Sequence, residues 1–124
     1  MVFIFGGAYQ GKLDYAKNNY SRGTVFDCRA GAPTPEMSAD IICGLEAFVK
    51  DCSGRGIEAA DWFRERKEEW RDKVLIMQDM SQGIVPMDKE ERAAREMNGR
   101  LMIYLAGEAD EVVRVFCGIG ERIK

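Results

Sequence analysis

Short apolar runs alternate with amphipathic segments along this chain, and the alternation predicts strands followed by helices. Val2 to Phe5 is a continuous run of strand formers that ends at Gly6-Gly7, and a helical pattern follows from about Gly11 to Tyr20. A second buried strand is predicted for Thr24 to Cys28. The loop after it, Gly31 to Pro35, contains prolines that the interior of a helix does not tolerate.

The middle of the chain is predicted to be helical. Ser38 or Asp40 can cap a helix whose apolar residues fall on one stripe. These residues are Ile41, Ile42, Leu45, Phe48 and Val49. Ser53 to Gly56 ends this helix, and a further helix is predicted from about Ile57 to Trp70, with its mixed-charge run turned to solvent.

The last third of the chain repeats the alternation. Lys73 to Met77 is predicted as a strand, followed by a turn at Gln82 to Pro86. Asp88 can cap a long helix that extends to about Ala106. Glu111 to Cys117 is the last main strand, and Gly118 to Lys124 is predicted to add a short hairpin strand. Strands that alternate with helices predict mainly parallel pairing in a three-layer α/β sandwich, formed by a single domain of residues 1–124.

Composition narrows the class of protein. The 124 residues are 46% hydrophobic and 31% charged, which is typical of a globular domain. A net charge of -3 and a pI near 5.1 argue against a nucleic-acid-binding surface. The opening apolar run is too short for a signal peptide or a membrane span, so we expect a cytoplasmic protein. The 4 cysteines form no CxxC pair, and we expect reduced, mostly buried thiols.

The chain contains no histidine, so any catalysis must use carboxylates, lysine, tyrosine, cysteine or a metal. The candidate for such chemistry is the segment between the first strand and the first helix, which matches the spacing GxxxxGK. It reads Gly6-Gly7-Ala8-Tyr9-Gln10-Gly11-Lys12-Leu13. Glycines let backbone N–H groups turn toward phosphate, and Lys12 would contact the β and γ phosphates. The alternative is a glycine-rich turn that binds nothing.

Two aspartates are predicted at the carboxyl ends of strands, the edge where open α/β sheets bind ligands. Either Asp27 or Asp79 could position Mg²⁺ through water and assist catalysis alongside Lys12. The alternative is that each acid caps a turn or a neighbouring helix. Leu13 stands where the full phosphate-loop motif has a serine or threonine that binds Mg²⁺.

Both ends of the chain carry motifs that resemble one enzyme family. The matching segments are Gly6-Gly7-Ala8, Val25-Phe26-Asp27-Cys28, Gly83-Ile84-Val85-Pro86, Arg92, Arg95, Gly99-Arg100, Leu105-Ala106, Ala109-Asp110-Glu111-Val112 and Gly118-Ile119. On these residues the chain resembles a shortened relative of the bifunctional adenosylcobinamide kinase and adenosylcobinamide-phosphate guanylyltransferase of cobalamin biosynthesis. The resemblance covers both ends well and the middle poorly.

The resemblance implies a P-loop NTPase-like sandwich of reduced size, with ATP or GTP and Mg²⁺ as cofactors and a corrinoid alcohol as acceptor. It also implies a homo-oligomer, and it places Arg92, Arg95 and Arg100 beside the nucleotide. The family's histidine that accepts GMP lies in a segment that this chain lacks, since only Asn18 to Gly23 joins the first helix to the second strand. We therefore expect guanylyltransferase activity to be absent.

Two hypotheses about function stay open. The first is a nucleotide binder that resembles adenosylcobinamide kinase and transfers a phosphoryl group from ATP or GTP. The second is a catalytically silent relative that serves as a binding, regulatory or oligomerisation module, which Leu13 favours. For the three arginines the alternative is an ordinary helix surface, with Arg92 paired to Asp88 or Glu96.

Overall fold

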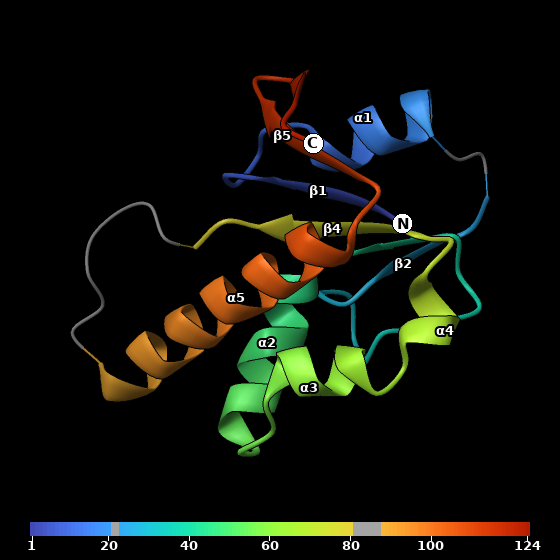
Figure 1. Cartoon of the computed structure of the whole chain (residues 1–124). Coiled ribbons are helices and arrows are strands. Elements are labelled where there is room, and N and C mark those ends of the chain that lie inside the picture. The colour runs from blue at the N-terminus through green and yellow to red at the C-terminus, as the bar shows by residue number, and fades with distance from the viewer. Residues whose placement is uncertain (21–22, 81–87) are drawn as a thin grey trace.

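The computed structural model describes residues 1–20, 23–80 and 88–124, which form a six-stranded sheet with helices on both faces (Figure 1). The strands are β1 Val2–Gly6, β2 Val25–Asp27, β3 Ile41–Cys43, β4 Val74–Gln78, β5 Glu111–Phe116 and β6 Ile119–Arg122. The helices are α1 Lys12–Asn19, α2 Leu45–Gly54, α3 Ala59–Arg64, α4 Lys67–Trp70 and α5 Lys89–Glu108. The predicted α/β class is confirmed.

The strands lie in the order β2-β3-β4-β1-β5-β6, and all neighbours are parallel except β5 and β6. The predicted, mainly parallel sheet is thus confirmed. β1 lies between β4 and β5, with Phe3 opposite Leu75 on one side and Val112 on the other. A strand inside a parallel sheet is covered on both faces, which is why its sequence is an unbroken apolar run.

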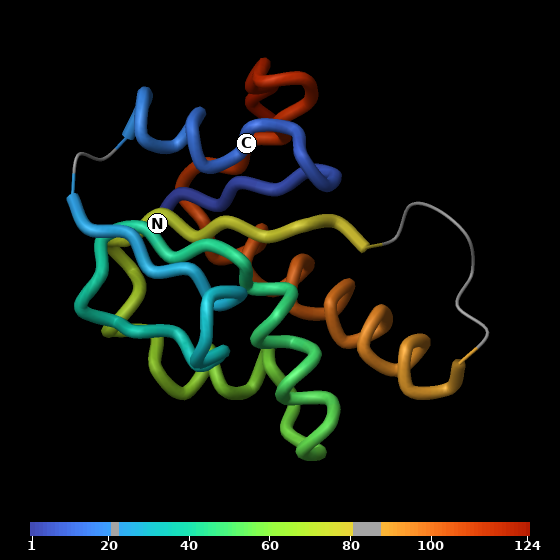
Figure 2. The backbone as a smooth tube through the Cα atoms, turned by 180° about the vertical axis from the view of Figure 1, so that it is seen from behind, coloured from blue at the N-terminus to red at the C-terminus, as the bar shows by residue number. Residues whose placement is uncertain are grey.

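Successive residues of each strand face opposite layers of the molecule. In β1, Phe3 packs in the larger core beneath α2, α3 and α5, whereas Ile4 packs in the smaller core with Ala16 of α1. Figures 1 and 2 show α1 on one side of the sheet and the other helices on the opposite side. Helices on both faces are compatible with the predicted sandwich.

The prediction of a helix beginning at Ile41 is wrong. Residues Ile41–Cys43 form β3, a fully buried strand that is paired with β2 and with β4. Gly44, with φ of 71°, then turns the chain so that α2 begins at Leu45. Asp40 caps no helix; its side chain accepts a hydrogen bond from the backbone N–H of Thr24 at 2.9 Å. Two isoleucines before a leucine fit a helical stripe or a strand, and only the pairing decides between them.

The predicted helix from Ile57 to Trp70 is divided in two, because the chain turns between α3 and α4. The turn brings Trp70 back beneath α3, where its indole N–H donates to the carbonyl oxygen of Phe63 at 2.7 Å. Trp70 is only 1% exposed. The indole therefore fills the core and adds a second hydrogen bond to the Phe63 carbonyl, which also accepts from the Arg66 N–H.

Several boundaries near the C-terminus agree with the predictions. The Asp88 side chain caps α5 by accepting a hydrogen bond from the Glu90 N–H at 2.7 Å. β6 forms the predicted hairpin strand, and Cys117 and Gly118 make the two-residue turn with φ of 51° and 76°. The predicted turn at Gln82 to Pro86, with its GIVP motif, lies outside the described residues.

Within the described residues, no helix is both long enough and apolar enough to cross a membrane. The predicted burial of most cysteines is confirmed, since of the four thiols only that of Cys117 is exposed. The buried ones are Cys28, Cys43 and Cys52.

Candidate functional site

The GxxxxGK segment lies where its spacing predicts, between the carboxyl end of β1 and the first turn of α1. Gly6 ends the strand, and Gly11 precedes the helix in the left-handed conformation with φ of 84°. Glycine adopts this conformation without the steric cost of a side chain. No side chain among the described residues caps α1, so the N–H groups of its first turn face the loop without a side-chain acceptor.

Lys12 is the first residue of α1, and its side chain turns back onto the loop. Its ammonium group donates a hydrogen bond to the carbonyl oxygen of Gly7 at 2.6 Å. Burial lowers the pKa of Lys12, the Glu46 carboxylate acts against this shift, and the Arg29 guanidinium lowers the pKa further. Lys12 thus lies within electrostatic range of both of these side chains.

The loop is tied to the β5–β6 hairpin through Gln10. The Gln10 side-chain oxygen accepts from the Cys117 N–H at 2.6 Å, and its backbone carbonyl accepts from the Gly118 N–H at 2.8 Å. Tyr9, by contrast, has φ of 57° and a fully exposed ring. The hairpin therefore fixes the middle of the loop, and Ala8 and Tyr9 stand at its exposed tip.

A cavity of about 360 Å³ lies beside the loop, at the carboxyl edge of the sheet. Small-molecule sites occupy roughly 300–1,000 Å³, so this space is large enough for a small ligand. Gln10, Lys12 and Leu13 border it from the loop and α1, Arg29 from the segment after β2, and Glu46 from α2. Parallel strands bring these sequence-distant groups together because their carboxyl ends share one edge.

Glu46 is a site residue that the sequence analysis missed. It lies in the first turn of α2, is 8% exposed, and accepts a hydrogen bond from the Gln78 backbone N–H at 2.9 Å. Its other carboxylate oxygen is 3.9 Å from Nε of Arg29. The signal was available in the sequence, since an apolar run, Gly44 and then a helix repeats the strand–glycine–helix order of the first loop.

Asp27 ends β2 as predicted, but both of its carboxylate oxygens face Arg29. Nε and Nη2 of Arg29 each donate to a different oxygen of Asp27 at 3.1 Å. The forked hydrogen bond from Arg29 holds the pKa of Asp27 below its usual value. Gly44 makes room for the pair, because a Cβ there would come within 3 Å of Arg29 Cγ.

Asp79 follows β4 and lies at the base of the loop. Its backbone N–H donates to the Gly6 carbonyl oxygen at 2.8 Å, and its side chain borders a small hollow with Gly7 and Gln10. β3 separates the strand that carries Asp27 from the one that carries Asp79. Throughout residues 1–20, 23–80 and 88–124, no group of three or more cysteine, aspartate and glutamate side chains could hold a metal ion.

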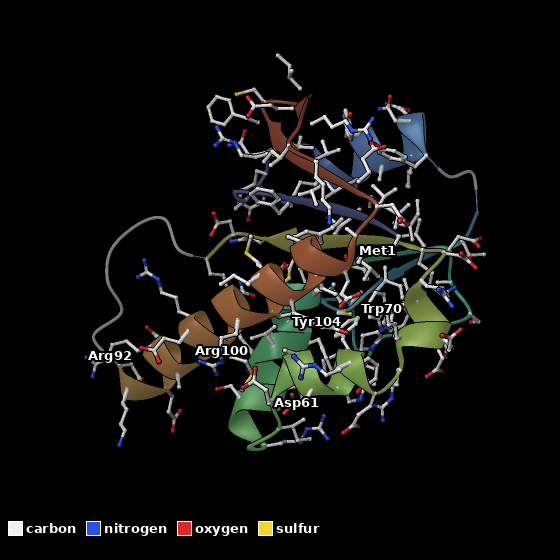
Figure 3. All side chains as sticks on the ribbon, viewed as in Figure 1. Met1, Asp61, Trp70, Arg92, Arg100 and Tyr104 are labelled. Carbon is white, nitrogen blue, oxygen red and sulfur yellow. The ribbon has the colours of Figure 1, made fainter. Side chains whose placement is uncertain are left out.

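The three predicted arginines all lie on α5, but the structure does not bring Arg100 to the loop. Figure 3 shows Arg92 near the N-terminal end of α5 and Arg100 closer to the middle of the helix. Nη2 of Arg100 is 3.0 Å from the Glu58 carboxylate, and the pair borders a separate hollow between α3 and α5. Arg95 is half-buried and borders another hollow, with Lys50.

Cys43 borders the main cavity, yet its thiol is unsuited to nucleophilic chemistry. Burial is the main cause that raises the pKa of Cys43 to about 11, and the nearby Asp27 carboxylate adds to the shift. The thiolate is the reactive form of cysteine, so a thiol with this pKa is inert near neutral pH. The charged residues that border the cavity are Lys12, Asp14, Arg29 and Glu46.

Comparison with protein-family models gives no match, and comparison with curated proteins gives none either.

Proposed function

We propose that this chain binds ATP or GTP through the loop between β1 and α1. The observation that carries the proposal is the placement of Lys12, which starts α1, contacts the Gly7 carbonyl and borders the cavity. A phosphate oxygen can replace that carbonyl as the acceptor from Lys12. The uncapped N–H groups of the first turn of α1 supply further donors and the positive end of the helix dipole.

The side chains at this site fit Mg²⁺ poorly. Leu13 offers no oxygen at the position where a phosphate loop holds the metal through serine or threonine. Of the two predicted metal ligands, Asp27 has both carboxylate oxygens engaged by Arg29. Asp79 lies beside the loop, next to Gly7 and Gln10. Lys12 and backbone N–H groups of the loop would therefore neutralise the phosphate charge.

Titration of a fluorescent ATP or GTP analogue tests the binding proposal. We expect saturable binding below millimolar concentration, weakened about tenfold or more in Lys12→Ala, because a hydrogen bond to a charged group contributes roughly 1.5–3 kcal/mol. Lys17→Ala is the matched control, since Lys17 is exposed on the same helix. Absence of saturation at millimolar nucleotide, or equal affinity for Lys12→Ala and the wild type, would refute the proposal.

Phosphoryl transfer is a second candidate function, and the placement of Glu46 in the same cavity favours it. The acceptor hydroxyl, on a corrinoid-type alcohol, would attack the γ phosphorus while the bond to the β–γ bridging oxygen breaks. The hydroxyl proton would pass to the Glu46 carboxylate. A corrinoid is larger than the cavity, so only its hydroxyl-bearing arm would enter.

Glu46→Gln separates turnover from binding, since the amide oxygen of glutamine can still accept from the Gln78 N–H. We expect the variant to keep nucleotide affinity and to lose transfer of radiolabelled γ-phosphate to cobinamide. Equal transfer by Glu46→Gln and the wild type would contradict this role.

The alternative of a silent binding, regulatory or oligomerisation module is tested at Leu13. If the module is silent, Leu13→Ser should gain nucleotide hydrolysis or transfer over the wild type. A wild type that turns over nucleotide as fast as Leu13→Ser would exclude this alternative. The homo-oligomer implied by the family resemblance is tested by sedimentation of the same samples.

A further inference from the structure

Arg29 is a second cation on the cavity that Lys12 borders, and neither the loop motif nor the family resemblance includes it. It follows β2, whereas Lys12 follows the loop after β1. β3 and β4 lie between β2 and β1 in the sheet. The ends of β1 and β2 are therefore about 14 Å apart, which is three strand spacings of about 4.8 Å. The long side chains of Lys12 and Arg29 nevertheless border the same cavity.

Each cation is held by an acceptor of the chain itself. Lys12 donates to the Gly7 carbonyl, and Arg29 forms a fork on Asp27. The Arg29 side chain is 55% exposed, and an ion pair exposed to this degree contributes little to stability. The guanidinium can therefore leave Asp27 for a better acceptor at low cost, and phosphate suits its planar fork as well as a carboxylate does.

We propose that Arg29 binds the phosphate chain of the ligand at the end distant from Lys12, exchanging Asp27 for a phosphate oxygen. This inference rests on the proposed function and specifies its ligand class. Two cations that border one cavity from different strands of the sheet favour an extended anion with two or more phosphoryl groups over single orthophosphate. The ligand also relieves the repulsion between the cations, because its negative charge lies between them.

Gly44 supports the geometry of this second contact. The Asp27–Arg29 pair packs against the backbone of Gly44, at the turn where β3 becomes α2. A β carbon at residue 44 would collide with the Asp27 carboxylate and with the stem of Arg29. The turn thus leaves the pair room at the edge of the cavity, where Arg29 is already positioned for an incoming phosphate chain.

Calorimetric titration with tripolyphosphate and with orthophosphate, both without metal, tests the inference. We expect Arg29→Ala to weaken tripolyphosphate binding about tenfold and to leave orthophosphate binding unchanged, whereas Lys12→Ala weakens both. Arg55→Ala is the matched control, because Arg55 forms an ion pair with Asp51 and is 53% exposed, compared with 55% for Arg29. Arg55 does not border the cavity.

Asp27→Asn tests the exchange itself. Removing the competing carboxylate should tighten tripolyphosphate binding several-fold, and the Nε–Hε resonance of Arg29 in the wild type should shift during the titration. Affinity equal to or weaker than wild type in Asp27→Asn, with no shift of that resonance, overturns the exchange.

The two proposals fail in different ways. If the wild type binds neither anion, the proposed function and this inference fall together. If Lys12→Ala weakens tripolyphosphate binding and Arg29→Ala does not, only the inference is overturned. Equal weakening of both anions by Arg29→Ala overturns the selection for an extended anion.

Discussion

Alanine at Gly6 would place a β carbon against the backbone carbonyl of Val115 in the neighbouring strand. The two atoms would be closer than 3.0 Å, a separation that β carbons essentially never show. Gly6 is buried at the end of β1, and β5 lies directly beside it. Because the opposing atom belongs to a backbone, no change of side-chain rotamer relieves the contact, and the pairing of β1 with β5 must open locally.

The expected cost is about 2 kcal/mol. Overpacking a well-filled interior costs roughly 1–3 kcal/mol, and loss of glycine's freedom in the unfolded chain offsets roughly 0.4–1 kcal/mol of this. Because the new β carbon would meet backbone atoms, we expect the overpacking cost of Gly6→Ala to lie near 3 kcal/mol, roughly the upper limit, before the offset is subtracted. With a urea dependence of roughly 1–3 kcal/mol per molar, the midpoint of unfolding should fall by about 1 M.

Gly7→Ala is the matched control for urea unfolding followed by circular dichroism. Among the described residues, a β carbon at Gly7 would meet only Cγ of Gln10, at 3.7 Å, which is an ordinary contact. We expect its free energy of unfolding to stay within about 0.5 kcal/mol of the wild type. If the two variants shift the midpoint equally, the close approach of β1 and β5 is not what requires glycine at Gly6.

Three further predictions concern titration, thiol reactivity and the core. Arg29 lowers the pKa of Asp27 in the folded state, so the ionised Asp27 stabilises the fold above about pH 4, and this stabilisation is lost as the pH falls further. In Asp27→Asn the urea midpoint should therefore fall less steeply with decreasing pH than in the wild type. An equally steep fall in both proteins would contradict this. Ellman's reagent should react quickly with Cys117 alone in the native protein and with all 4 cysteines in urea, so a rapid native reaction in Cys117→Ser would be inconsistent with the buried thiols. Trp70→Phe should lower the free energy of unfolding by about 1–3 kcal/mol, because the buried ring becomes smaller and the indole hydrogen bond is lost, although the Phe63 carbonyl still accepts from the Arg66 N–H; a change below about 0.5 kcal/mol would contradict this.

Local sequence patterns predicted the elements whose conformation depends on neighbouring residues alone. The apolar run of β1, with glycines after it, could only be a buried strand that enters a turn. Asp88 before a long amphipathic segment predicted the start of α5, and the structure has the same cap. These predictions succeeded because each depends on residues that are neighbours in the chain, so that propensity and capping decide the result.

The sequence was ambiguous where long-range pairing chooses between two local solutions. Ile41 and Ile42 suit a helical stripe, yet they form β3 because β2 and β4 supply hydrogen-bonding partners on both sides. The break between α3 and α4 was likewise unforeseen, since the buried contact of Trp70 with Phe63 stabilises it from outside the local segment. Tertiary contacts override propensity in both cases.

For the candidate site, the sequence by itself determined the strand–glycine loop–helix arrangement, because these elements are contiguous from Val2 to Asn19. Only the tertiary structure decided what faces that loop. The order of the strands brings Glu46 and Arg29 to the cavity, whereas Arg100 lies on α5 and pairs with Glu58. The physical reason is that parallel strands gather distant residues at one edge, in an order that the sequence does not encode locally.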